Sequence, residues 1–212
     1  MTSIPPKTIG TVFLKYPQIY ILSDEIYEHI NFVGKHESIA QFDDLKDRVI
    51  VVNGLSKSFA MTGWRLGYMA GPREVIAASE KIQSQFTSGP NSITQRAAIT
   101  ALQGGLDDTL KMREAFHERR DYLVKALREI SGLKVNNPPG AFYVFPDISF
   151  FLGKKDIKTA EDLCMYLLHE AQVSCVTGEA FGDPNCIRIS YATSLEKIKE
   201  AVVRIKAALA AL

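Results

Sequence analysis

Two short apolar segments that run into polar residues constrain the fold of this chain more than any other feature. Residues 20–24 read YILSD and residues 49–54 read VIVVNG. Short apolar runs with polar carboxyl ends are typical of buried strands in a parallel sheet. In such sheets, ligands bind beyond the carboxyl ends of the strands. The first part of the chain is therefore expected to be an α/β unit with a ligand site at that edge.

The rest of the chain divides at a long polar helix, expected at about residues 107–130 and followed by a Ser-Gly break. Before this helix, residues 1–19 supply no clear element, and the patterns predict a strand at 64–70 and helices at 72–85 and 91–103. After it, they predict strands at 133–135, 141–145, 173–176 and 186–191, and helices at 161–170 and 195–210. We therefore expect a large α/β domain in residues 1–105, and a connecting helix with a small α+β domain in residues 106–212.

The charge balance argues against two classes of partner. The 212 residues include 25 basic and 24 acidic side chains, a net charge of +1, which gives no electrostatic basis for binding nucleic acid or an anionic membrane. No apolar run approaches the roughly 20 residues of a membrane helix, and the first residues lack the pattern of a secretory signal. Three widely spaced cysteines without a CxxC pair predict neither a disulfide framework nor a metal site. A reducing cytoplasm is the expected setting.

Lys57 stands just past the expected second strand, after a turn of small residues. A lysine amine at that edge can point at a bound group, and a desolvated lysine forms Schiff bases with carbonyls. Arg65 follows at the start of the next expected strand and could neutralise a phosphate with its planar fork of donors. Ser56 adds a hydroxyl donor. An exposed lysine on a small-residue loop also fits this spacing, so the spacing alone leaves both interpretations open.

Asp24 follows the first apolar strand at the same carboxyl edge. A buried carboxylate at that position needs a cationic or proton-donating partner, and a protonated pyridine nitrogen would be one. Tyr27 could donate a hydrogen bond to a phenolic oxygen. The alternative interpretations are a helix N-cap for Asp24 and a core aromatic for Tyr27.

Arg188 lies in the middle of the expected strand at 186–191. Alternation places Ile187 and Ile189 on one face and Arg188 on the other. An arginine between apolar residues in mid-strand needs a carboxylate partner. The sequence leaves open whether that carboxylate belongs to the protein or to a substrate.

Taken together, several segments resemble the class I aminotransferases of pyridoxal-phosphate fold type I in their order and spacing. They are SDEIYE at 23–28, NGLSKSFAMTGWRLGY at 53–68 and CIRISYA at 186–192. Two more, QFTSGPNSITQRAA at 85–98 and PPGAFYVFPDIS at 138–149, resemble the bacterial aspartate aminotransferases. The likeness extends from about residue 12 to the end of the sequence.

The resemblance implies a role for each candidate residue toward the cofactor, pyridoxal 5′-phosphate. Lys57 is similar to the lysine that forms the Schiff base and moves the substrate proton. Asp24 resembles the partner of the pyridinium nitrogen, and Tyr27 the hydroxyl donor to O3′. Arg65 resembles the ligand of the phosphate, with Ser56 as a further candidate nearby.

For the substrate, the resemblance implies that Arg188 clamps the α-carboxylate. The expected reaction is amino-group transfer from aspartate to 2-oxoglutarate, in a full-length parent that forms a homodimer. Family members are usually much longer, so the chain is expected to be the carboxyl-terminal half, which alone binds cofactor weakly and turns over little. Alternatives are another reaction on the same cofactor, such as aromatic transamination or carbon–sulfur lysis, and a non-catalytic truncated domain.

Overall fold

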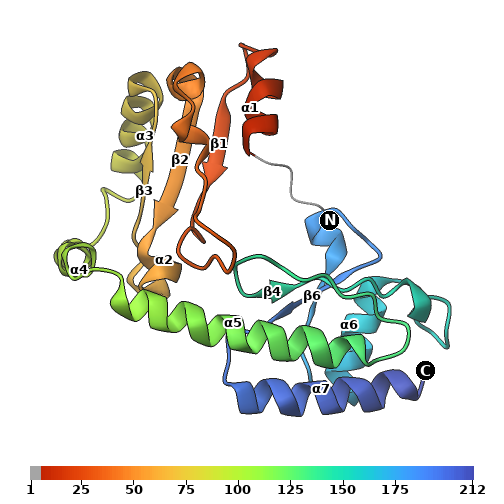
Figure 1. Cartoon of the computed structure of the whole chain (residues 1–212). Helices are drawn as coiled ribbons and strands as arrows, with labels where there is room; N and C mark the ends of the chain where they lie inside the picture. The colour runs from red at the N-terminus through yellow and green to blue at the C-terminus, as the bar shows by residue number, and fades with distance from the viewer. Residues whose placement is uncertain (1–5) are drawn as a thin grey trace. The chain divides into compact units, whose positions relative to one another are not determined.

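The computed structural model describes residues 6–212, which form two compact units divided between Lys111 and Met112 (Figure 1). Helices and small sheets occur in both units, which confirms the predicted α/β class. The assignment of domains with a boundary after residue 105 stays a prediction, because compactness alone does not define where a folding domain ends. None of the described helices is long and apolar enough to span a membrane.

The sheet of the first unit has three strands in the order β1-β2-β3, with β1 at Ile21–Asp24, β2 at Val49–Gly54 and β3 at Gly67–Ala70. β1 and β2 pair in parallel, as the two apolar segments predicted. β3 pairs with β2 in the antiparallel direction, so these three strands form a mixed sheet. The third strand is shorter than predicted, because a 3-10 turn, η3 (Thr62–Trp64), takes up its expected start.

One face of this sheet is covered by α1 (Pro6–Leu14) and two 3-10 helices, η1 (Ile39–Gln41) and η2 (Asp43–Arg48). The buried residues of this cluster are Ile21, Ile39, Leu45 and Val49. No sequence pattern predicted α1. A residue far along the sequence holds the carboxyl end of α1 and the turn after it. The Arg48 guanidinium donates hydrogen bonds to the carbonyls of Phe13, Tyr16 and Ile19 at 2.7, 2.8 and 3.1 Å.

Beyond β2 the chain forms a one-turn helix, α2 (Leu55–Ser58), and after β3 it forms α3 (Arg73–Phe86) and α4 (Ser92–Gln103). The α3 and α4 helices lie close to their predicted positions. Asn91 caps α4, where its side chain accepts the backbone N–H groups of Ile93 and Thr94. A second buried cluster joins α2 to α4 through Leu55, Met61 and Ala98.

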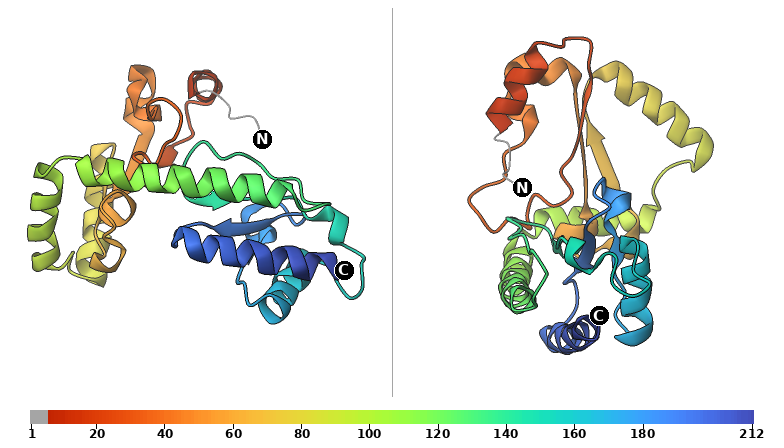
Figure 2. Two further views of the ribbon diagram at one scale, coloured as in Figure 1. Left: turned by 60° about the horizontal axis from the view of Figure 1, so that its bottom comes forward. Right: turned by 90° about the vertical axis from the view of Figure 1, so that its right-hand side faces the viewer.

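The second unit contains most of α5 (Asp107–Arg128), followed by α6 (Ala160–Glu170), α7 (Leu195–Ala210), and two 3-10 helices, η4 (Ser149–Phe151) and η5 (Gly178–Phe181). Its small antiparallel sheet has the order β4-β6-β5, with β4 at Tyr143–Val144, β6 at Ile187–Ser190 and β5 at Val176–Thr177. α6 and α7 lie side by side (Figure 2). The predicted strand at 133–135 is wrong, because Lys134 makes only an isolated bridge to Asp147.

The core of the second unit contains fully buried side chains from α5, α6 and α7 and from the residue that follows β6, including Leu127, Leu163, Ile205 and Tyr191. The three cysteines are free thiols, and Cys164 and Cys186 are buried, whereas Cys175 is half-buried. Burial raises the pKa of the Cys164 thiol to about 11, and those of Cys175 and Cys186 to about 12. All three thiols are therefore protonated and unreactive near neutral pH.

Gly178 starts η5 at a point where no side chain fits. A Cβ atom there would lie 2.3 Å from the Cys186 carbonyl oxygen and 2.4 Å from that of Asp183. We therefore expect Gly178→Ala to lower the free energy of unfolding by about 1–3 kcal/mol, measured by urea denaturation. Gly63→Ala is the control, because a Cβ at Gly63 meets nothing within 4 Å. Equal stability of the two variants would contradict this packing.

Candidate cofactor and substrate sites

The candidate residues of the first unit gather at one end of its sheet. β1 ends at Asp24, which lies opposite Val52 on β2, and Lys57 follows the end of β2 on α2. Because β3 is antiparallel to β2, its first residue, Gly67, pairs with the last residue of β2, and Arg65 lies two residues before Gly67. The mixed sheet thus brings the carboxylate, the amine and the guanidinium to the same edge, although they lie up to 41 residues apart in the sequence.

The helix that carries Lys57, α2, is a single turn and is not stable by itself, so its position depends on tertiary contacts. At its start, the Leu55 N–H donates to the Leu66 carbonyl at 3.3 Å. A Cβ on Gly54 would lie 2.9 Å from the Gly67 Cα atom, so the two backbones touch there. The Leu55 side chain, 1% exposed, anchors the helix in the cluster with α4.

The other end of α2 is held by the first turn of α5. The hydroxyl of Thr109 donates a hydrogen bond of 2.6 Å to the Ser58 carbonyl, and both residues are buried. A buried carbonyl without a donor would be costly. The backbone on either side of Lys57 is therefore fixed, while the Lys57 and Ser56 side chains are half-buried at the surface of the site.

Arg65 adopts the left-handed backbone conformation, with φ at 56°. Residues other than glycine adopt this conformation rarely, and such positions often belong to functional sites. Its exposed guanidinium donates one hydrogen bond, of 2.9 Å, to the Thr62 carbonyl. The remaining N–H groups of the fork have no acceptor among the described residues and are available to an anion.

The burial expected for the Asp24 carboxylate is wrong. Asp24 is exposed, and its side chain accepts the backbone N–H of Ile26 at 3.2 Å, which resembles the capping alternative. The buried carboxylate at this edge is the next residue, Glu25, because the alternation of β1, which buries Ile21 and exposes Asp24, continues into the turn after the strand. Tyr27 is half-buried in the same turn.

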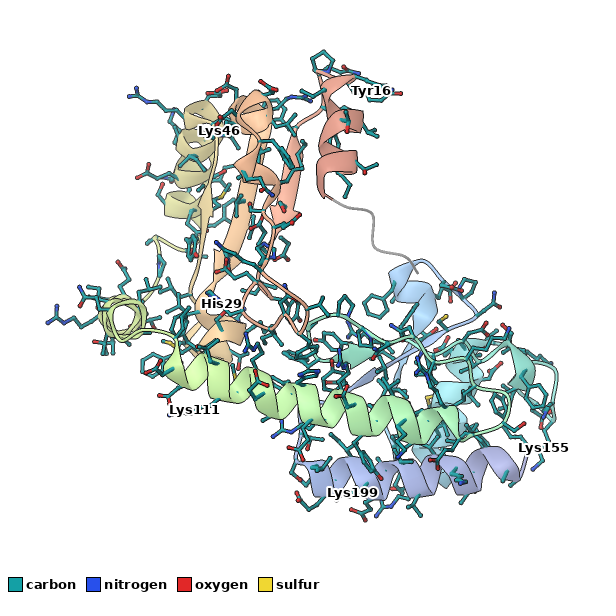
Figure 3. The ribbon with its side chains drawn as sticks, in the orientation of Figure 1. Tyr16, His29, Lys46, Lys111, Lys155 and Lys199 are labelled. Atoms are coloured by element: carbon teal, nitrogen blue, oxygen red, sulfur yellow. The ribbon has the colours of Figure 1, made fainter. Side chains whose placement is uncertain are left out.

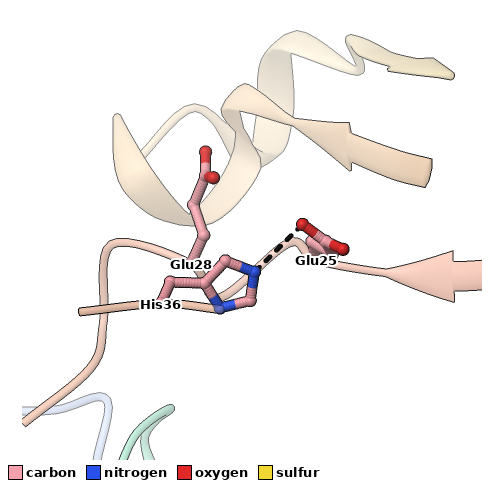
Figure 4. Close-up of side chains that lie close together, drawn as sticks. All are labelled: Glu25, Glu28 and His36. Carbon is pink, nitrogen blue, oxygen red and sulfur yellow. Dashed lines mark hydrogen bonds and ion pairs between the residues drawn. The ribbon is translucent and has the colours of Figure 1, made fainter. Parts of the chain in front are cut away.

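Glu25 is the centre of a hydrogen-bond network in the loop after β1, which the sequence did not reveal. It is 7% exposed and accepts hydrogen bonds from Ser38 at 2.7 Å and Ser23 at 3.0 Å, and its other oxygen lies 3.0 Å from His36 Nε2 (Figure 4). Burial acts to raise the pKa of Glu25, but the hydrogen bonds from Ser38, His36 and Ser23 outweigh it and hold that pKa below its usual value. His29, in the same loop (Figure 3), approaches Glu28 at 3.1 Å.

Glu25, Glu28 and His36 each bring one possible metal-ligand atom within 4.8 Å of the others. Figure 4 shows the Glu28 side chain extending away from the other two. Both Glu25 oxygens already take part in hydrogen bonds within the protein. The group is therefore explained as a hydrogen-bond network that fixes the loop after β1.

Arg188 in the second unit lies between two aromatic rings. Its guanidinium carbon lies 4.1 Å from the centroid of the Phe181 ring and 4.4 Å from that of Tyr143. As predicted, Ile187 and Ile189 are buried while Arg188 is half-buried. No carboxylate among residues 6–212 forms an ion pair with Arg188. Of the two partners that the sequence left open, a carboxylate from outside the chain is therefore favoured.

Comparisons with known proteins identify the family. The model for "Aminotransferase class I and II" matches residues 2–205. A bifunctional aspartate aminotransferase and glutamate/aspartate-prephenate aminotransferase of Petunia hybrida is 51% identical over 210 residues, which cover 95% of this chain and 44% of the relative. An aspartate aminotransferase of Rhizobium meliloti (strain 1021) is 48% identical, with 93% of this chain and 50% of the relative covered.

Solved structures agree with this identification. The crystal structure of an aspartate aminotransferase from Rhizobium meliloti has a TM-score of 0.93 at 44% identity, and covers 99% of this chain and 55% of that one. An aromatic aminotransferase from Pyrococcus horikoshii OT3 has a TM-score of 0.88 at 36% identity, with 100% and 56% covered. The chain belongs to the class I and II aminotransferase family. It spans about half the length of the curated relatives that it matches.

The Glu25 network gives a prediction for stability as a function of pH. We expect Glu25→Gln to lower the free energy of unfolding at neutral pH by about 1–3 kcal/mol, because buried donors lose a charged acceptor. The pKa of Glu25 is lower in the folded state than the ordinary value of 4.5. Its contribution is therefore complete above the unfolded pKa and is lost as the pH falls through the folded pKa.

The test is urea denaturation from neutral pH down to the acid limit of the folded state. The difference between wild type and Glu25→Gln should shrink as the pH falls. The exposed Glu37 offers the matched control, Glu37→Gln, which should change little at any pH. A constant difference across the series would mean that the charge of Glu25 is not what stabilises the loop.

Proposed function

We propose that this chain is the cofactor-anchoring part of a pyridoxal-phosphate-dependent aminotransferase, with Lys57 as the residue that attaches the cofactor. One observation carries the proposal. Three groups meet at the end of the sheet where β1 and β2 finish and β3 begins. Lys57 follows the central strand, β2, while Asp24 ends β1 on one side and Arg65 precedes β3 on the other. An amine thus stands between a carboxylate and a guanidinium.

This set of groups fits the chemical parts of pyridoxal 5′-phosphate. A lysine amine condenses with an aldehyde, a guanidinium binds a phosphate dianion through several N–H groups, and a carboxylate pairs with a protonated pyridine nitrogen. The unused donors of Arg65 and the exposed carboxylate of Asp24 leave both groups accessible to such a ligand. When bound, the cofactor supplies an electron sink for the pair of electrons left at the substrate Cα.

The residues of the chain would supply the acid–base and positioning roles. The Lys57 amine would take and return the proton at the substrate Cα, since it is the basic group fixed at the middle of the edge. Asp24 would hold the proton on the pyridine nitrogen, and the Tyr27 hydroxyl would donate to the phenolic oxygen. Ser56, half-buried beside Lys57, would add a donor to the phosphate that Arg65 binds.

For the substrate, Arg188 would bind the α-carboxylate of an amino acid or a 2-oxo acid. We infer that the full-length parent transfers the amino group of aspartate to 2-oxoglutarate, as a cytoplasmic homodimer. The relatives from Petunia and Rhizobium, which are named for aspartate, support this donor. The likeness to the Pyrococcus aromatic aminotransferase keeps aromatic donors as the second candidate. Profiling amino donors on the full-length parent would separate the two.

The attachment of the cofactor can be tested on the chain itself. The chain is incubated with pyridoxal 5′-phosphate, reduced with borohydride, digested and analysed by mass spectrometry. We expect the phosphopyridoxyl group on Lys57, in preference to exposed lysines such as Lys111 (Figure 3). Lys57→Ala should abolish this product, and Lys111→Ala should leave it unchanged. Arg65→Ala should lower labelling of Lys57 by about tenfold, because a charge-assisted bond to the phosphate is lost.

The outcome that contradicts the proposal is labelling spread evenly over the exposed lysines. Labelling of Lys57 that survives Arg65→Ala without loss would contradict the phosphate role of Arg65 but not the attachment to Lys57. Because Lys57 and Arg65 both lie at the surface of the site, circular dichroism of the variants should match the wild type.

A further inference from the structure

The surroundings of Arg188 follow from the small sheet of the second unit. Arg188 lies on the central strand, β6, and Ser190, two residues later, lies opposite Tyr143 on β4. Residues two apart on a strand share a face, so Tyr143 is the diagonal neighbour of Arg188 on that face. This position explains how the Tyr143 ring comes to within 4.4 Å of the guanidinium carbon.

The second ring comes from the other side of the central strand. β5 pairs with β6 so that Val176 lies opposite Arg188, and the chain then turns directly into η5, which ends at Phe181. The turn is closed by Gly182 in the left-handed conformation, with φ at 84°, and it depends on the absence of a side chain at Gly178. The backbone of this loop therefore sets the place of the Phe181 ring.

Each of the two rings is supported by a further aromatic residue. Phe145 contacts Phe181 edge to face, with ring centroids 6.2 Å apart at 89°, and Phe142 lies 4.8 Å from Tyr143. Phe142 is buried, whereas Phe181 is 46% exposed. The Phe181 ring is exposed, yet a glycine-dependent turn and an aromatic neighbour hold it in place. Core packing does not explain this arrangement.

The arrangement suits the recognition of a carboxylate. A guanidinium binds a carboxylate through N–H groups in its own plane, while aromatic rings contact its faces. Rings on the faces therefore restrict the side chain without using the donors that a carboxylate needs. A long arginine side chain otherwise loses rotamer freedom on binding, and holding it beforehand removes part of that cost.

We propose that Tyr143 and Phe181 are positioning residues, which hold the Arg188 guanidinium in the orientation that receives a substrate carboxylate. The inference rests on the proposed function, because Arg188 is the group that would touch the substrate. The two rings act through Arg188, and their role is to make one orientation of its fork dominant before a ligand arrives. Glycine at 178 is required for the same reason, since it fixes the loop that carries Phe181.

The position of the guanidinium can be tested by NMR of the ¹⁵N-labelled chain. The Nε–H signal of Arg188, identified by its loss in Arg188→Lys, should be displaced upfield by the two rings. Phe181→Leu should remove much of that displacement, and Phe181→Tyr should restore it. The matched control is Phe150→Leu, because Phe150 is similarly exposed, at 53%, and has the Lys154 amine 3.8 Å from its ring centroid.

Titration with succinate then tests the purpose of the arrangement. In the wild type, the Arg188 signal should respond to succinate more strongly than the signals of the other arginines. We expect Phe181→Leu and Tyr143→Leu each to weaken this response about fivefold, as the loss of one cation–π contact predicts. Tyr143→Phe should keep the affinity, and Phe150→Leu should not change it. Thermal unfolding establishes that the variants are folded.

The outcomes separate the two levels of the argument. A wild-type Arg188 signal that does not respond to succinate overturns the proposed substrate role of Arg188, and this inference with it. A response that is equally strong in wild type, Phe181→Leu and Tyr143→Leu leaves the role of Arg188 intact and overturns the positioning role of the rings.

Discussion

The attachment of a single helical turn to the end of a central strand is the constraint on which the candidate cofactor site depends. That turn carries Lys57, and it is too short to be stable alone. It is fixed where Gly54 touches the first residue of β3, where Leu55 enters the core, and where Thr109 donates to the Ser58 carbonyl. The last contact bridges 51 residues and is buried. The amine is thus presented from a rigid backbone, which is what a covalent attachment point requires.

The same principle applies to the groups that would bind anions. Arg65 is held by a left-handed backbone and one hydrogen bond, and Arg188 by two aromatic rings, and neither arrangement uses up the guanidinium donors. Neither arginine is neutralised by a carboxylate of the described chain. On a chain with a net charge of +1, these two cations are local features, and the role proposed for them is recognition of an anion at short range. By contrast, the Glu25 carboxylate accepts hydrogen bonds within the protein, and it stabilises the loop after β1.

Much of this arrangement was predictable from the sequence, because it depends on local patterns. The polar ends of two apolar strands identified the edge where Asp24 and Lys57 lie, and the periodicity of residues 195–210 gave the bounds of α7. The features that the sequence did not reveal are long-range contacts. The end of α1 is held by hydrogen bonds from Arg48, and the position of Lys57 depends on the hydrogen bond from Thr109 to the Ser58 carbonyl. Burial at the end of β1 falls on the residue after Asp24, because the alternation that buries Ile21 and exposes Asp24 continues into the next residue, Glu25.

The most direct test of the account is a crystal structure of the chain after borohydride reduction with pyridoxal 5′-phosphate. The account predicts continuous density from the Lys57 amine into the ligand, with the phosphate in contact with Arg65 and the pyridine nitrogen facing Asp24. Density on another lysine, or a ligand on Lys57 whose phosphate points away from Arg65 while Asp24 faces a different cavity, would contradict it.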